Sequence, residues 1–242
     1  MKARKGTRHW TGGEPGTKAI DSVAVVNPEQ WADDLADSMT DLLRTIAEKE
    51  ALKAARALDK AGVIDKVIAD GDGFPNARTH LERLIGGRGS NRDSILGRPV
   101  EDVRNMIRES ALRQSQKLAD TIKEMDEAGA SIDDIRKEVS KKIGSRSSWR
   151  KGLAVHAATS VMEGARNRVY ARGGKYVKRK WNTVNDERVR PSHRKAEGQV
   201  RDATTPFRVG GALLRYPGDP TAPIEETANC RCHVEPVIDL GA

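Results

Sequence analysis

Two cysteines near the C-terminal end are the residues of this 242-residue chain best suited to chemistry. Cys230 and Cys232 are separated only by Arg231. Two cysteines cannot build a disulfide framework, and a disulfide between such near neighbours would close a strained ring. We therefore expect both side chains to be reduced thiols.

A metal-assisted nuclease or a Cys–His hydrolase could be assembled from these thiols together with His193, Asp186 and Glu163. Either reaction needs a base within hydrogen-bond reach of the nucleophile or water that it activates, and the sequence spacing does not impose that geometry. The chain also has no phosphate-binding loop ending in Gly-Lys-Ser/Thr, no Gly-x-Ser-x-Gly elbow and no His-Glu-x-x-His helix. We predict that the protein is not an enzyme, and a nuclease or hydrolase centred on His193, Cys230 and Cys232 is the alternative.

Basic residues gather in one stretch of the chain. The sequence has 43 Lys and Arg against 35 Asp and Glu, a formal net charge of +8, and twelve of the basic residues lie between positions 141 and 180, where Glu163 is the one acid. This segment is expected to meet DNA or an acidic protein surface, with a solvated helix face as the alternative. Because aromatic residues are sparse there, DNA binding would be non-specific. The residues predicted to make this contact are Lys141, Lys142, Arg146, Arg150, Lys151, Lys178, Arg179 and Lys180.

The elements that must position these residues fall into three parts. The first 27 residues are rich in glycine and lack apolar periodicity, which predicts a flexible arm. Asn27-Pro28 then forms a typical helix start, and Gly62 can provide the left-handed exit of that helix. After position 174 the chain changes to short β-favouring runs separated by Pro and Gly. We predict an α+β fold with an arm at 1–27, a helical region at 28–143 and a C-terminal domain at 144–242.

Long helices are predicted at 28–61, 99–128 and 147–171, and a short one at 131–143. In the first of them, apolar residues recur every three or four positions. A similar stripe in the second helix includes Ile107. Such stripes exceed what an isolated helix needs, so we expect Leu42 and Ile107 to be buried between the helices or against a partner. The stripe of the first helix consists of Trp31, Leu35, Met39, Leu42 and Ile46.

Three segments, 175–184, 207–216 and 232–238, are expected to form a small antiparallel β module that packs on the preceding helix. No run of residues approaches the roughly 18 apolar positions that a bilayer-spanning helix needs, and the first ten residues lack the apolar centre of a signal peptide. We therefore expect a soluble protein that is made in the cytoplasm and has no membrane partner.

The C-terminal domain also contains an ordered set of short motifs. They read Trp181-Asn182-Thr183, Asp186-Glu187-Arg188-Val189-Arg190-Pro191-Ser192-His193, Glu197-Gly198, Pro206-Phe207, Pro217-Gly218-Asp219-Pro220 and Asn229-Cys230-Arg231-Cys232. Each motif is weak alone, but their order is specific. The set spans about residues 147–240 and resembles the phage Mu F-like head-morphogenesis family.

This resemblance implies a minor capsid protein of a tailed phage, present in few copies inside the head. Its implied partners are the portal protein or the major capsid protein, and in some cases the packaged DNA. Its implied role is in head assembly or in genome packaging and delivery, without an established catalytic activity. The expected location is the host cytoplasm before assembly and the virion afterwards.

The motif residues have structural interpretations, which we prefer to catalytic ones. Asp186 is expected to tie the turn that follows it, with Arg188 or Arg190 as its ion-pair partner. Arg190 is also expected to tether its loop through carbonyl groups. Gly198 supplies a backbone conformation closed to other residues, and Asn229 favours a turn in which its side chain bonds to its own backbone. The proline-flanked Gly-Asp motif at 217–220 is typical of tight turns.

One departure from the family pattern concerns metal. Many relatives are similar but carry a Cys-x-x-Cys pair where this chain has Arg190 and His193, so the four-thiol arrangement that could hold zinc in those members is reduced here to His193, Cys230 and Cys232. A structural zinc site needs four ligands, and His233 would point to the other face of a strand from its neighbour Cys232. We therefore expect no cofactor, and zinc on these three residues is the alternative.

Overall fold

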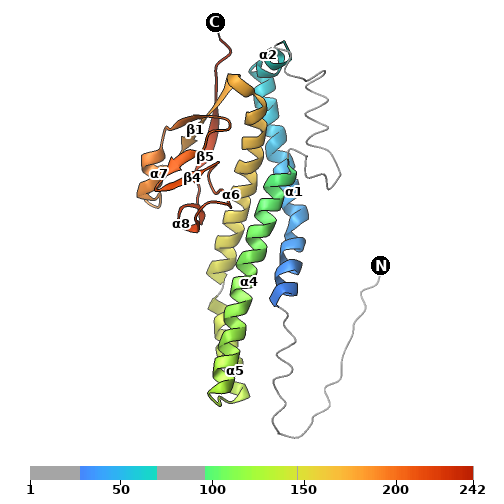
Figure 1. The fold of residues 1–242 in the computed structure, drawn as a ribbon, viewed down its shortest axis with the longest axis vertical. Coiled ribbons are helices and arrows are strands. Elements are labelled where there is room, and N and C mark those ends of the chain that lie inside the picture. The colour runs from blue at the N-terminus through green and yellow to red at the C-terminus, as the bar shows by residue number, and fades with distance from the viewer. Residues whose placement is uncertain (1–27, 70–95, 146, 242) are drawn as a thin grey trace, which may run out of the picture.

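The computed structural model describes residues 28–69, 96–145 and 147–241. The predicted N-terminal arm and the candidate residue Arg146 lie outside this part of the chain. Among the described residues, no helix has the length and apolar character needed to cross a bilayer. The helices form the longer part of the molecule (Figure 1).

Long helices form an elongated bundle along the long axis of the molecule (Figure 1). Its members are α1 (Pro28–Lys60), α2 (Val63–Ala69), α4 (Gly97–Glu127), α5 (Ile132–Ser145) and α6 (Ser147–Arg172). α1 packs against α4 and α6, and α4 packs against α6 and α5. The predicted pairing of the two long N-terminal helices is therefore confirmed, and α6 joins them as a third member.

The helix ends follow local sequence signals. α1 begins at Pro28, as predicted, and ends just before Gly62, whose φ is +75°. Ser131 caps α5, because its hydroxyl donates to Oδ2 of Asp134 at 2.6 Å and accepts the Asp134 amide at 3.2 Å. α4 begins at Gly97, earlier than predicted, because Pro99 fits in a first turn, where an amide hydrogen has no helical partner to lose.

The face of α1 that packs into the bundle is made largely of alanine. Ala36 and Ala47 are fully buried and Leu43 is 2% exposed. Leu42 is 59% exposed, so of the two predicted alternatives burial between the helices does not apply to it, whereas Ile107 is fully buried as predicted. Alanine lets the helix axes approach closely, so the larger side chains of the predicted stripe lie at the margin of the interface or outside it.

Residues 174–241 form the C-terminal module, which contains short helices and two small sheets. Its helices are η2 (Gly174–Tyr176), α7 (Pro191–Ala196) and α8 (Ile224–Thr227), and its strands are β1 (Val177–Asn182), β2 (Val200–Asp202), β3 (Phe207–Val209), β4 (Ala212–Leu214) and β5 (His233–Ile238). β1 lies between β2 and β5 in an antiparallel sheet, and β3 pairs with β4 in a hairpin. All three predicted β segments are confirmed, and the α+β class with them.

The module packs on α6 through the buried side of β1. Along β1 the side chains alternate, so that Val177, Arg179 and Trp181 are buried while Lys178 is exposed. Trp181 meets the ring of Phe207 edge-on at a centroid distance of 5.3 Å, and both side chains are fully buried. This aromatic pair joins the two sheets into one core against α6.

Candidate functional site

His193, Cys230 and Cys232 form a buried group, here named the His–Cys cluster, between α7 and the loop that precedes β5. α7 begins at Pro191, which places His193 in its first turn with only 2% of the residue exposed. Nδ1 of His193 lies 3.4 Å from Sγ of Cys232 and 3.7 Å from Sγ of Cys230. The structure therefore brings together the three residues that the sequence singled out as candidate metal ligands.

A carboxylate from a third element lies beside the histidine. Oε2 of Glu226, on α8, lies 3.2 Å from Nε2 of His193, and Ser192 Oγ donates to the same oxygen at 2.8 Å. A carboxylate beside Nε2 favours the tautomer that carries its hydrogen there. Nδ1 faces the two sulfur atoms, as an acceptor in the neutral ring and as a donor once the ring is protonated.

The two thiols are unequal acids. Hydrogen bonds from the Cys232 thiol, from His193 and from the Cys232 amide lower the pKa of Cys230 below its ordinary value, although burial opposes this. The hydrogen bond that Cys232 gives to Cys230, together with burial, raises the pKa of Cys232. Burial lowers the pKa of His193, but its hydrogen bond with Cys230 has the opposite effect and the net change is upward. Cys230 is therefore the sulfur that ionises first.

A small cavity of about 20 Å³ adjoins the cluster and is lined by Val184, Val189, Asn229 and the cluster residues, among others. A cavity of this size holds about one water molecule, for which roughly 10–15 Å³ is the lower limit. The site is thus too small for an organic substrate. It has room for one ion and a water-sized ligand.

The remaining members of the predicted catalytic set lie in other contacts. Asp186 forms a bidentate ion pair with Arg231, at 2.6 and 2.7 Å, and accepts the backbone amide of Arg188. The predicted turn at Asp186 is confirmed, but the predicted ion-pair partners were wrong, because Arg231 approaches from the loop before β5. Arg190 donates to the carbonyl of Ala228, as one of its predicted roles required. These contacts tie the segment before α7 to the loop that carries both thiols.

Glu163 links the module to two helices of the bundle. Its Oε2 accepts the Val234 amide of β5 at 3.0 Å, and its Oε1 pairs with Arg166, which also binds Glu50 of α1. Burial raises the pKa of Glu163 to about 7, although Arg166 opposes the shift. With Asp186 at the surface and Glu163 bound in this way, the structure does not place either carboxylate as a base for the thiols.

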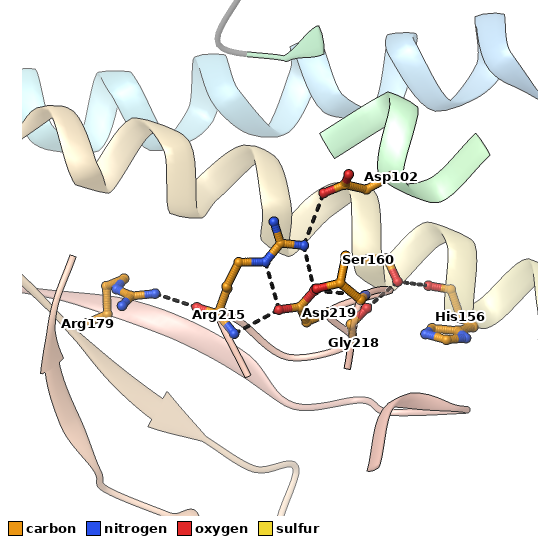
Figure 2. Close-up of polar contacts among 8 residues, drawn as sticks. Asp102, His156, Ser160, Arg179, Arg215, Gly218 and Asp219 are labelled. Atoms are coloured by element: carbon orange, nitrogen blue, oxygen red, sulfur yellow. Dashed lines mark hydrogen bonds and ion pairs between the residues drawn. The ribbon is translucent and has the colours of Figure 1, made fainter. Parts of the chain in front are cut away.

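The Pro-Gly-Asp-Pro motif forms the second polar cluster, which Figure 2 shows. Asp219 is 1% exposed and accepts hydrogen bonds from the side chains of Arg215, at 2.6 and 2.8 Å, and of Thr221. Burial raises the pKa of Asp219, but its hydrogen bonds, those from Arg215 above all, bring it below the ordinary value. Arg215 also reaches Asp102 of α4 at 3.0 Å. The carbonyl of Gly218 contacts the hydroxyl of Ser160 on α6, so this predicted turn also anchors the module to the bundle.

Arg179 was predicted to face a polyanion, and the structure corrects this. Its side chain is buried between the sheet and α6, where it donates to Asn167 Oδ1 and to the carbonyls of Arg215, Asp202 and Thr205. Burial lowers the pKa of Arg179 to about 10, so it stays charged at neutral pH. A guanidinium with several rigid donors can satisfy several carbonyls at once, which explains how this buried cation is held mainly by carbonyl groups.

The other predicted basic residues do not form one surface. Lys141 and Lys142 lie on α5, at one end of the bundle, whereas Lys178 and Lys180 lie on β1 in the module beside its other end (Figure 1). Lys151 is exposed near the start of α6, while Arg146 and the side chain of Arg150 lie outside the described part of the structure. Closeness in sequence was misleading because α6 runs between the two groups.

The structure reveals instead a basic groove of about 590 Å³ on the module. Lys178 is the one predicted residue in it, and Arg201 and Arg208 are cations that the sequence analysis missed. They lie outside the basic segment, although Arg208 stands at the exposed position of a buried-exposed-buried strand. The groove is lined by Lys178, Val200, Arg201, Asp202, Thr205, Pro206, Arg208 and Leu213.

Two turn positions of the motif set have a left-handed backbone, as predicted for Gly198. Gly198 has a φ of +73° and Asn229 a φ of +53°, so both adopt the left-handed conformation. The side chain of Asn229 lies against Gly152 of α6. Phe207 and Pro217 are buried in the module, and Pro220 is partly buried. The residues that carried the family resemblance thus have structural contacts in this fold.

The described chain is therefore a helical bundle joined to a small β module whose motif residues hold loops and helices together. Residues 116–235 match the family model described as Phage Mu protein F like protein, and over this half of its length the chain belongs to that family. It is a phage head-morphogenesis family of structural proteins. The match begins within α4 and includes α5, α6 and most of the module. No curated protein and no solved structure matches the chain.

Proposed function

We propose that this protein is a minor capsid protein that binds the portal inside the phage head and assists head assembly or genome packaging and delivery. Its family supports a role among head components. The observation that carries the finer proposal is the apolar stripe of α1, formed by Trp31, Leu35, Met39, Leu42 and Ile46.

This stripe presents large apolar groups to solvent along a helix that is otherwise well packed. Leu42 is 59% and Trp31 is 38% exposed, while Leu35, Met39 and Ile46 are half-buried against the core. Two exposed apolar side chains flanking partly buried ones on one helix face are consistent with a surface that another protein covers. A non-enzymatic role fits the same features, because they offer a contact surface and the His–Cys cavity is too small for an organic substrate.

The test is co-expression with the portal and major capsid proteins of the same phage, followed by isolation of the portal ring. Wild-type protein should co-purify with the ring, and Leu42→Asp should abolish association without changing the melting temperature. Ser140→Asp, which adds the same charge at an exposed position of α5, is the matched control and should bind normally. Absence of the wild-type protein from the ring, or unchanged binding by Leu42→Asp, would contradict the proposal.

DNA contact is a second proposed function, and the basic groove supports it. Lys178, Arg201 and Arg208 line one groove in which Asp202 is the acidic side chain. Replacing all three cations with Gln should flatten the salt dependence of DNA binding by up to about 3 units, at roughly 0.9 per phosphate contact. The matched control is the Gln triple variant at Lys141, Lys142 and Lys151, which should keep the parent slope. Equal changes of the salt dependence in the two triple variants would show that the groove is not the DNA-binding surface.

A further inference from the structure

The His–Cys cluster gathers one nitrogen and two sulfur atoms within the spacing of ligands around a single metal ion. Two sulfur atoms converge on one nitrogen, Nδ1 of His193, at 3.4 and 3.7 Å. A ring nitrogen offers either one hydrogen or one lone pair, so it engages one sulfur at a time, and Cys232 uses its own hydrogen on Cys230. An ion bound between the three atoms would engage all of them.

The observed spacing suits zinc in particular. With Zn–N of about 2.0–2.1 Å and Zn–S of about 2.3 Å at tetrahedral angles, the nitrogen and sulfur ligand atoms stand roughly 3.5–3.6 Å apart. The distance from Nδ1 to Sγ of Cys232, 3.4 Å, is slightly shorter than this range, and the distance to Sγ of Cys230, 3.7 Å, is slightly longer. Nitrogen and thiolate sulfur are also the ligands that zinc prefers.

The surroundings complete the arrangement. Histidine ligands of zinc commonly donate their other ring N–H to a carboxylate, and Glu226 stands 3.2 Å from Nε2 of His193. Ser192 holds that carboxylate. Gly210 makes room for it, because a Cβ there would lie 2.1 Å from Oε1 of Glu226. A carboxylate, a hydroxyl and a glycine from three separate segments thus fix the direction of Nδ1.

His233 is not the fourth ligand. The side chain of His233 is 39% exposed and its Nε2 lies 3.5 Å from Glu235, away from the cluster. The cavity of about 20 Å³ beside the sulfurs offers a place for one water molecule. Three protein ligands with an open fourth position form a known class of zinc site, in which water completes the coordination.

We propose that the His–Cys cluster binds one Zn²⁺ through Nδ1 of His193 and Sγ of Cys230 and Cys232, with a water molecule as the fourth ligand. Binding replaces the two thiol protons, which are released to solvent, with two Zn–S bonds, and His193 contributes its lone pair. The ion ties α7 to the loop before β5 and so stabilises the C-terminal module. It is independent of the portal contact, which lies on α1.

The experiment uses the full-length protein purified under reducing conditions, with Zn²⁺ or Co²⁺ as the probe. Elemental analysis should find one zinc per chain after dialysis, and a chelator should lower the melting temperature. Co²⁺ added to the zinc-free protein should give the visible absorption bands of a tetrahedral, thiolate-bound ion. Glu226→Gln should keep the stoichiometry at saturating zinc but weaken affinity by about 10- to 100-fold.

Matched variants separate this site from other zinc binding. Cys230→Ser, Cys232→Ser and His193→Asn should lose the stoichiometric ion, while His233→Asn should keep it. Wild-type protein without stoichiometric zinc, or without the cobalt bands, would overturn the proposal. Full zinc content in Cys230→Ser would also overturn it, because the ion would then lie elsewhere. If Cys230→Ser does not fold, the cobalt spectrum and the zinc-dependent melting of the wild-type protein decide the question.

Discussion

The helical bundle and the C-terminal module bury different kinds of side chain. In the bundle, α1 presents Ala36, Ala47 and Leu43 to its neighbours, and most of the interior is apolar, with Glu163 of α6 as a buried charged exception on the side of the module. In the module, Arg179 and Asp219 are each 1% exposed and lie among aromatic and aliphatic residues. Helical periodicity therefore determines which residues form the interior of the bundle, whereas the interior of the module depends on particular hydrogen-bond partners.

This difference has an energetic consequence. Burial of apolar surface is non-directional, so a helix interface tolerates modest changes of side chain when the total volume is kept. A buried polar group must keep its partners, since each partner left unpaired costs roughly 1–3 kcal/mol. Replacing a buried polar residue of the module should therefore reduce stability more than a substitution at most positions of the bundle.

The largest effect is expected for Arg179→Met. The substitution keeps much of the side-chain volume but leaves the carbonyls of Arg215, Asp202 and Thr205 without their donor. We expect the free energy of unfolding to fall by about 4 kcal/mol. Chemical denaturation measures this change, and Arg201→Met, on the strand position paired with Arg179, is the control that should cost under about 0.5 kcal/mol. Equal losses in the two variants would contradict the special role of the buried cation.

The next effect tests the bundle. Leu43→Ala should lower the free energy of unfolding by about 3 kcal/mol, because it leaves a cavity at a position that is 2% exposed. Leu42→Ala, one residue earlier and mostly exposed, should change it by less than about 0.5 kcal/mol. The pair is measured by denaturation of the isolated protein. A larger loss of unfolding free energy from Leu42→Ala would indicate that Leu42 is buried, as its position in the stripe predicted.

The sequence predicted the bundle well because helix boundaries depend on local residues. Pro28 marked the start and Gly62 the end of the first helix, and Gly62 has the positive φ that was expected. The choice between Leu42 and Leu43 could not be made in the same way. Which of the two leucines is buried depends on the face of α1 that carries the alanines, and a prediction based on large apolar residues gives alanine little weight.

The candidate site was predictable in its three residues and not in its environment. Cys230, Cys232 and His193 are the residue types that bind metal, so they could be selected from the sequence. Glu226 could not, because α8 reaches His193 only through the fold of the loops between them. The burial of Arg179 could not be predicted for a related reason. A charge suggests solvent exposure until the carbonyls that surround it are known.

A third prediction concerns the seam between the two regions. A Cβ on Gly164 of α6 would lie 3.0 Å from Cβ of Pro99 and 3.1 Å from the hydroxyl of Tyr216, which belong to α4 and to the module. Gly164→Ala should cost about 1 kcal/mol, since this overpacking outweighs the better helix propensity of alanine. Gly152→Ala, in the same helix, would meet only the side-chain amide of Asn229 at 3.3 Å, and it should be neutral or stabilising. Similar melting temperatures for the two variants would show that the seam can adjust.

The smallest effect is expected for the exposed ion pairs of the bundle. Asp37 of α1 is 63% exposed and pairs with Arg104 of α4 at 2.6 Å. Asp37→Asn should cost no more than about 0.5 kcal/mol, because solvent screens the attraction and two long side chains must be held in place. The cost should vanish in about 1 M salt, where the screening length is roughly 3 Å.

Asp219→Asn is the matched substitution in the module, where the carboxylate is almost fully buried and also pairs with an arginine. It should cost several times more than Asp37→Asn, and high salt should not remove the difference, because buried pairs are screened far less. Measuring both variants by denaturation at low and high salt therefore compares the same chemical change in the two regions. If Asp37→Asn cost as much as Asp219→Asn, the bundle would also rely on specific polar contacts, and the contrast between an apolar interior and a hydrogen-bonded one would no longer hold.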